Sequence, residues 1–252
     1  DLVRSRGLGD VYKRQIEDQA YFAMDFRTDF SHPFRAPYPP TIAHYTDNYI
    51  LMLSGSKIFS YAGQRIALVC MSPAVAERRY DYLRDFYGME RYGDAYIYGV
   101  LYVASSGTAH SAQFAMAAML DAAADGTLDF VGTCRDYGVR ASRARQAFTG
   151  NGFHLVYDHD GDSPISDGFF FTVGYGDMDS VTLQRELLKH GVATISLPST
   201  GSKQNGVRVC VSMLTDESDF ENLERHLATF AAEHGAAETA CQPAMADECC
   251  HN

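Results

Sequence analysis

The chain has 252 residues, of which 46% are apolar, and its formal net charge is −11. This length allows one large domain or two modest ones, and the acidic balance excludes a general nucleic-acid binder. No apolar run approaches the ~20 residues that span a bilayer, so we expect no membrane partner. The six cysteines show neither CxxC nor a zinc-type spacing with histidine, which predicts no metal site and a reducing, cytoplasmic setting.

The sequence does not predict folded structure at the two ends of the chain. Residues 1–15 (DLVRSRGLGDVYKRQ) lack both a helical period and an apolar signal-peptide core. They resemble translated adapter sequence, and we exclude them from the fold as a leader that is not native. Residues 236–252 are small and polar and end in a Cys-Cys-His run, which predicts a tail.

The first part of the chain alternates loops with short strands and helices. A strand-like segment, Ile16–Phe26, leads into a proline-rich loop at 27–41. Short apolar runs predict strands, and longer segments without internal Gly or Pro predict helices. The strands are predicted at 49–54 and 65–71, and the helices at 72–86, where Ser72-Pro73 marks the start, and at 109–124.

The pattern changes near residue 140. A helix with arginines at helical spacing is expected at 136–149, and strands and helices then follow at short intervals. The strands are predicted at 153–157, 168–173, 192–197 and 207–213, and the helices at 179–190 and 215–234. In the last helix Thr215 is the expected N-cap, and Phe220, Leu223, Leu227 and Phe230 form the apolar stripe. Cys70 and Cys210 lie in strand-like runs and are expected to be buried.

These elements predict an α/β protein of two parts. Residues 16–139 are expected to be the C-terminal part of a large, cofactor-binding domain with a mostly parallel sheet in a three-layer arrangement. Residues 140–235 are expected to form a small α+β domain.

The most informative motif is Ser54-Gly55-Ser56-Lys57, with Arg65 eight residues further on. A lysine that forms a Schiff base needs an amine that is held still and partly deprotonated. Hydroxyls and a guanidinium close to it bind an anionic group of the same ligand. The combination fits pyridoxal phosphate, with the aldehyde on Lys57 and the phosphate on Ser54 and Arg65. A serine-rich turn with a surface lysine is the alternative reading of this segment alone.

Two further motifs point to the same ligand. Asp18 and Tyr21 stand three residues apart at a predicted strand, where both can face one flat ring, although an exposed acidic turn has the same pattern. Arg208 enters an apolar strand, and its burial is costly unless a carboxylate pairs with it. An edge-strand arginine that faces water is the alternative.

Taken in order, the three motifs resemble the fold-type I, class I/II aminotransferases, which carry D-x-x-Y, then S-x-S-K with an arginine eight residues on, then a C-terminal arginine before a strand. The resemblance covers residues 16–235. It implies pyridoxal 5′-phosphate as cofactor, an amino acid and a 2-oxo acid as substrates, and a homodimer for the full-length protein.

The resemblance also implies a role for each residue. Lys57 binds the cofactor as a Schiff base and acts as general base and acid, Asp18 keeps the ring nitrogen protonated, and Tyr21 binds the ring oxygen. Ser54, Ser56 and Arg65 bind the phosphate. Arg208 binds the substrate α-carboxylate.

The N-terminal half of that family has no counterpart in this sequence, so we expect the chain to be a fragment that is incomplete for catalysis. Another reaction on the same scaffold stays open, because a C–S β-lyase uses the same lysine and aspartate. Arg208 favours amino transfer or β-elimination over decarboxylation, because both of these reactions retain the carboxylate that it would bind. A non-catalytic, aminotransferase-like regulatory domain is the alternative from another class. No second arginine indicates which amino acid is the donor.

Overall fold

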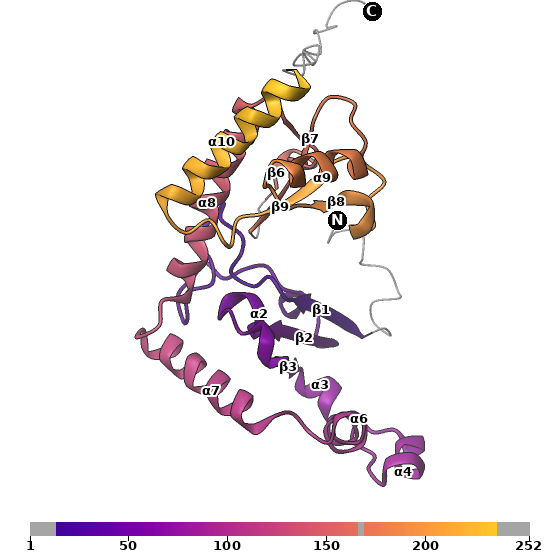
Figure 1. Cartoon of the computed structure of the whole chain (residues 1–252). Helices are drawn as coiled ribbons and strands as arrows, with labels where there is room; N and C mark the ends of the chain where they lie inside the picture. Colours follow the sequence, from indigo (N-terminus) through magenta and orange to yellow (C-terminus); the bar gives the residue numbers. More distant parts are fainter. Residues whose placement is uncertain (1–13, 166–168, 236–252) are drawn as a thin grey trace, which may run out of the picture. The chain divides into compact units, whose positions relative to one another are not determined.

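The computed structural model describes residues 14–165 and 169–235 and divides between Arg135 and Asp136 into two compact units (Figure 1). The predicted tail lies outside the described residues, as do residues 1–13 of the predicted leader. The last two residues assigned to that leader are described. Arg14 stacks on the rings of Tyr80 and Tyr92, and Gln15 begins the first strand.

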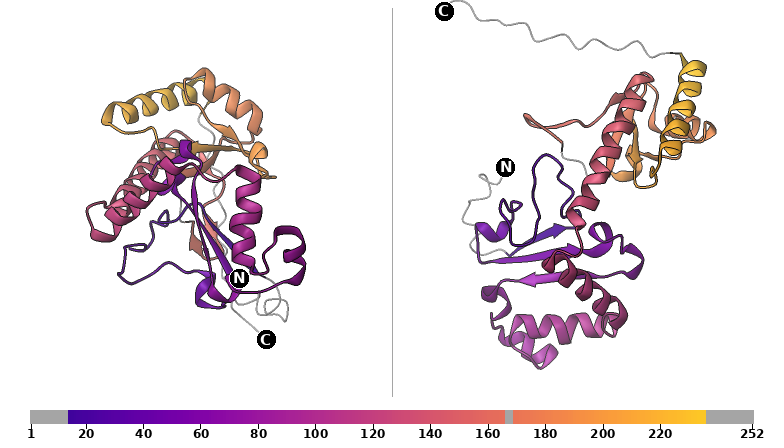
Figure 2. Two further views of the ribbon diagram at one scale, coloured as in Figure 1. Left: turned by 90° about the horizontal axis from the view of Figure 1, so that it is seen from below. Right: turned by 90° about the vertical axis from the view of Figure 1, so that its left-hand side faces the viewer.

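The first unit contains a three-stranded sheet in the order β1-β2-β3 (Figure 2, right). The strands are β1 (Gln15–Gln19), β2 (Tyr49–Ser54) and β3 (Ala67–Met71). β1 and β2 are parallel, with Asp18 opposite Met52, whereas β2 and β3 are antiparallel. The carboxyl ends of β1 and β2 therefore lie at the same edge of the sheet.

Helices follow the strands of this unit. They are η1 (Ile42–His44), α2 (Gly55–Ile58), η2 (Ala62–Gln64), α7 (His110–Asp125) and the start of α8 (Phe130–Gly150). Ile58 of α2 is buried in one apolar cluster with Ala123 of α7 and with Phe130. This contact fixes the short helix that carries Lys57.

The expected helix at 72–86 is wrong as a single element. Two short helices form instead, α3 (Pro73–Ala76) and α4 (Asp81–Tyr87). The backbone between them is extended, because Tyr80 N donates to Glu90 O and Tyr92 N donates to Arg78 O. These longer-range hydrogen bonds replace the helical ones. A helical stretch that the pattern did not indicate follows as α5 (Tyr92–Asp94), η3 (Ala95–Leu101, a π-helix) and α6 (Tyr102–Ser105).

The second unit is built on a four-stranded sheet in the order β4-β7-β9-β8, in which every neighbouring pair is antiparallel. The strands are β4 (His154–Leu155), β7 (Phe170–Gly174), β8 (Ile195–Ser196) and β9 (Val207–Cys210). A small hairpin, β5 (His159–Asp160) with β6 (Ser163–Pro164), lies outside this sheet. Cys210 ends β9 and is exposed, so its predicted burial is wrong, and Cys70 is half-buried.

Three helices enclose the core of the second unit: the part of α8 from Asp136 on, α9 (Ser180–Lys189) and α10 (Glu217–His234). A third 3-10 turn, η4 (Leu197–Thr200), follows β8. α10 runs beside α8 in both Figure 1 and Figure 2. Arg143 of α8 pairs with Glu217 of α10 and lies over the ring of Phe220. The predicted apolar stripe of α10 is confirmed, since all four of its residues are buried.

The caps of these helices follow the local sequence. Asp179 caps α9 by accepting from the backbone N–H groups of Val181 and Thr182, as the sequence indicates. α10 begins one residue later than expected, with Asp216 rather than Thr215 as its N-cap. The α/β class is confirmed. Each helix within the described residues is too short or too polar to cross a membrane.

Candidate active site

The carboxyl edge of β1 and β2 gathers most of the predicted site residues. Asp18 lies near the end of β1 with Tyr21 just beyond it, and Ser54 ends β2 directly before the helix that carries Lys57. Because the two strands are parallel, both chain segments leave the sheet on the same side. The Lys57 amine lies 5.9 Å from the centre of the Tyr21 ring. Sequence positions far apart are thus brought to one place.

The turn after β1 orients the acid and the phenol. Asp18 Oδ1 accepts a hydrogen bond of 3.0 Å from the backbone N–H of Ala20, which closes a turn at the strand end. Tyr21 O in turn accepts from Met24 N at 3.1 Å. Both side chains are exposed at this edge and line one open pocket of about 280 Å³ with Phe22, Phe30 and Pro39. The pocket offers apolar walls together with a carboxylate and a phenol.

Ser54 is the N-cap of α2. Its hydroxyl oxygen accepts from Ser56 N at 3.1 Å, which explains why a serine precedes this short helix. A hydroxyl that accepts in this way keeps its own proton, which it can donate to an anion. Ser54, Ser56 and Lys57 are half-buried, whereas the next residue, Ile58, is in the core. The helix therefore presents the two serines and the lysine next to one another.

Arg65 follows η2 and has the left-handed backbone conformation, with φ of +53°. For a residue other than glycine this conformation costs roughly 1 kcal/mol. The side chain is exposed, and its Nη1 donates to Ala62 O at 3.0 Å within the same turn. Ala23 (φ +63°) and Ser60 (φ +50°), in the turns that follow Tyr21 and Lys57, are left-handed as well. Strained backbone of this kind clusters at functional sites.

Glu17 supports this edge, although its role is not evident from the sequence. Its carboxylate accepts from Thr41 Oγ1 at 2.7 Å, Ile42 N at 2.8 Å and Gln19 Nε2 at 2.9 Å. Partial burial alone would raise the pKa of Glu17, but the hydrogen bonds outweigh it and hold that pKa below its ordinary value. Through these hydrogen bonds the Glu17 carboxylate holds the end of the proline-rich loop next to β1, beside Asp18. No local motif indicates this role, because Thr41 and Ile42 follow Glu17 by more than twenty residues.

Arg208 belongs to the second unit, where it lies in β9 between Thr172 of β7 and Ile195 of β8. It is half-buried, and its guanidinium lies 4.2 Å from the centre of the Phe170 ring. β9 is an inner strand of its sheet, so the reading of Arg208 as an edge-strand residue is wrong. When an arginine stacks on an aromatic ring, the N–H groups at the edge of its planar guanidinium can still donate to a carboxylate.

No protein-family profile and no curated protein matches the sequence. Solved structures do match. Aspartate aminotransferase of Thermus thermophilus, as a tetra mutant, shares 15% identity at a TM-score of 0.59, and the match covers 86% of this chain and 50% of that one. An Escherichia coli protein described with a methionine aminotransferase function shares 19% identity at a TM-score of 0.61, covering 86% of this chain and 49% of that one.

N-succinyldiaminopimelate aminotransferase of Mycobacterium tuberculosis shares 20% identity at a TM-score of 0.60, and the match covers 87% of this chain and 50% of that one. The chain thus spans about half the length of the solved structures it matches. Over most of its own length, this chain has the fold of the fold-type I aminotransferases.

Proposed function

We propose that the chain is part of an enzyme that uses pyridoxal 5′-phosphate to transfer an amino group from an amino acid to a 2-oxo acid. The observation that carries the proposal is the position of the Lys57 amine over the ring of Tyr21, at the strand edge where Asp18 lines a pocket. The fold shared with solved aminotransferases supports it.

The donor set at this edge fits the cofactor. The pyridine ring of pyridoxal phosphate needs a carboxylate for its protonated nitrogen, a donor for its ring oxygen and an amine for its aldehyde. Asp18, Tyr21 and Lys57 provide these groups. The phosphate needs hydroxyl and guanidinium donors, which Ser54, Ser56 and Arg65 provide. To reach that phosphate, Arg65 must exchange its present hydrogen bond to Ala62 O for one to the ligand.

When bound, the cofactor supplies an electron sink for the bond that breaks at the substrate α-carbon. Lys57 would take up and return the proton of the substrate α-carbon, as general base and acid. Arg208 binds the α-carboxylate by a bidentate pair, which orients the substrate. A homodimer and a cytoplasmic setting complete the proposal for the full-length protein.

Borohydride reduction tests this assignment, because it converts an aldehyde held on a lysine into a stable adduct. The purified chain is incubated with pyridoxal phosphate, reduced and mapped by peptide mass. We expect the phosphopyridoxyl label to concentrate on Lys57, to disappear in Lys57→Arg, and to persist in the matched control Lys203→Arg, which removes an exposed lysine of the second unit. Equal labelling of Lys57, Lys189 and Lys203 would contradict the proposal.

Product analysis separates transfer from β-elimination on the same fold. With an amino acid and a 2-oxo acid present, transfer yields a new amino acid and releases no ammonia. Release of ammonia together with pyruvate from a cysteine-type substrate would identify a C–S β-lyase instead.

A further inference from the structure

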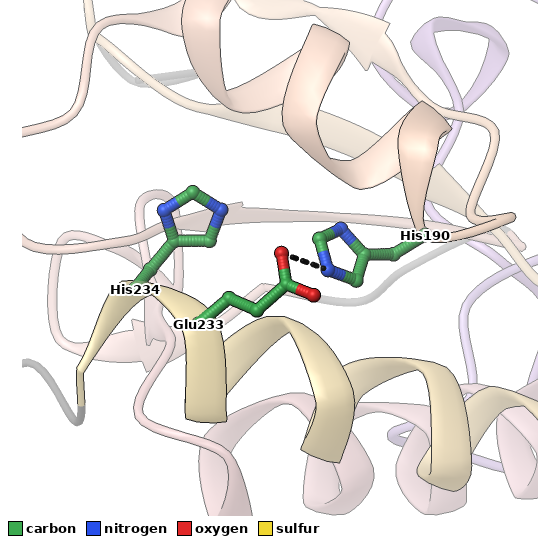
Figure 3. Close-up of side chains that lie close together, drawn as sticks. All are labelled: His190, Glu233 and His234. Atoms are coloured by element: carbon green, nitrogen blue, oxygen red, sulfur yellow. Dashed lines mark ion pairs between the residues drawn. The ribbon is translucent and has the colours of Figure 1, made fainter.

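Three potential metal ligands lie together in the second unit, and none of them is a residue assigned to cofactor or substrate. His190 follows the end of α9, and Glu233 and His234 are the last residues of α10. Figure 3 shows the His190 ring pointing toward these two side chains. One ligand atom from each residue lies within 4.8 Å of the others. No metal site is evident from the sequence, because His190 lies more than forty residues before the adjacent Glu233 and His234.

The hydrogen bond of His190 determines which ring nitrogen faces this cluster. Nδ1 lies 2.9 Å from the carbonyl oxygen of Glu186, which can only accept, so Nδ1 carries the proton. In the neutral ring the lone pair is then on Nε2. A backbone carbonyl that fixes the tautomer in this way is the usual second-shell partner of a metal-binding histidine. The side chain is only 8% exposed, so the ring is held in place.

Nε2 of His190 lies 3.1 Å from Oε2 of Glu233. A proton on Nε2 makes this contact an ion pair, and a metal cation between the two atoms can take the place of that proton. Neighbouring ligand atoms of one tetrahedral Zn²⁺ ion lie roughly 3.3 Å apart, given bonds of about 2.0–2.1 Å. The pair therefore already has the spacing that one ion requires.

His234 provides the third ligand. Its ring packs on Phe230, with centroids 4.5 Å apart, and lies near the His190 ring. Its ligand nitrogen lies within 4.8 Å of the other two ligand atoms, and because His234 is the last residue of α10, a rotation at the helix end would bring that nitrogen into the coordination sphere. The carboxylate of Glu186, which pairs with Lys189 and Arg185, has Oε2 4.0 Å from Nε2 of His234. Two imidazoles and a carboxylate with water as fourth ligand suit Zn²⁺.

We propose that His190, Glu233 and His234 bind a Zn²⁺ ion that fastens the C-terminal end of α10 to the end of α9. The bound ion stabilises the folded second unit, because it binds the native arrangement and not the unfolded chain.

Zinc affinity is measured by competition with a chromophoric chelator, on chain that carries no added histidines. We expect one ion per chain, and at least a tenfold loss of affinity in Glu233→Gln and in His234→Gln. Glu233 is 63% exposed, so its replacement leaves packing intact. The matched control is His159→Gln, which removes another His–carboxylate pair at 3.1 Å, with Asp158; among the described residues this pair belongs to no group of three potential ligands. Unchanged affinity in the two ligand variants would overturn the proposal.

Two further readouts keep the proposal testable. Zn²⁺ should raise the melting temperature of the wild-type chain and of His159→Gln, but not of Glu233→Gln. Co²⁺ in place of Zn²⁺ should give visible bands of a nitrogen and oxygen site. An intense thiolate-to-cobalt band in the near ultraviolet would place the ion on cysteines and would refute the assignment.

Discussion

The amine of Lys57 lies 5.9 Å from the centre of the Tyr21 ring, although the two residues follow different strands. The contact depends on the parallel pairing of β1 with β2, which directs both chain segments to one edge. A cation over an aromatic face is worth about 0.5–1 kcal/mol at an exposed site. Tyr21 therefore has two separable roles in the proposed site: its ring orients Lys57, and its hydroxyl binds the cofactor.

Replacing Tyr21 separates these roles. Tyr21→Phe keeps the ring and loses one hydrogen bond of about 1 kcal/mol, so the pyridoxal phosphate concentration that half-labels Lys57 should rise about fivefold. Tyr21→Leu also loses the ring face, so the pyridoxal phosphate concentration that half-labels Lys57 should rise several-fold further. Because Tyr21 is 46% exposed, neither change should unfold the chain. Equal labelling of all three proteins would remove Tyr21 from the site.

Glu17 predicts a pH dependence of stability. Its pKa is lowered in the folded chain, so its carboxylate stabilises the fold above the ordinary pKa of 4.5, and this contribution is lost as the pH falls through the lower, folded value. Glu17→Gln should cost about 1 kcal/mol near neutral pH, since it removes the charged acceptor for Thr41 and Ile42. The difference from wild type should shrink as the pH falls below about 4.

Urea unfolding at a series of pH values measures this difference. Thr41→Val is the matched variant, because it removes one of the donors and leaves the carboxylate in place. It should give a smaller loss of stability and a weaker pH dependence than wild type. A difference between Glu17→Gln and wild type that stays constant from neutral to acid pH would show that the carboxylate charge is not involved.

The cysteines predict contrasting reactivity. Burial, with a smaller effect of Asp129, raises the pKa of Cys134 to about 11, and its side chain is 1% exposed. Because the thiolate is the reactive form, iodoacetamide near pH 8 should modify the exposed Cys210 quickly and Cys134 only after unfolding. Peptide mapping of native and urea-treated chain distinguishes the sites. Comparable native rates at the two residues would disagree with the burial of Cys134.

The sequence predicted those elements whose signals are local. The apolar run of β2 has the observed bounds, and the cap of α9 and the apolar stripe of α10 depend on residues within two or three turns. The helix expected at 72–86 failed because its middle is paired with Glu90 and Tyr92, which no helical pattern reveals. Cys210 was misjudged because β9 alternates buried and exposed residues, and its last residue faces outward.

The same distinction applies to the candidate site. Lys57, Ser54 and Ser56 form a contiguous motif, and Asp18 with Tyr21 forms another, so spacing alone makes both sets candidates. Glu17 was missed because its importance arises from partners at Thr41 and Ile42, which only the fold brings to β1. The His190 cluster was missed for the same reason. Residues that act through distant contacts have no periodic or spacing signal in a single sequence.

The start of α10 tests one difference between sequence and structure, namely whether Asp216 or Thr215 is the N-cap. Asp216 Oδ1 accepts from Asp219 N at 3.1 Å, and Asp219 Oδ2 accepts in return from Asp216 N at 3.2 Å, which forms a capping box. Asp216→Ala should lower the free energy of unfolding by about 1 kcal/mol. Asp216→Asn should lower it by much less, because asparagine also caps helices well. Thr215→Ala, which removes the hydroxyl of the residue that the sequence favoured as cap, should cost less, because Thr215 only donates to Asp219. Chemical denaturation of the three variants gives the order, and a larger loss at Thr215 than at Asp216 would return the cap to the position that the sequence indicated.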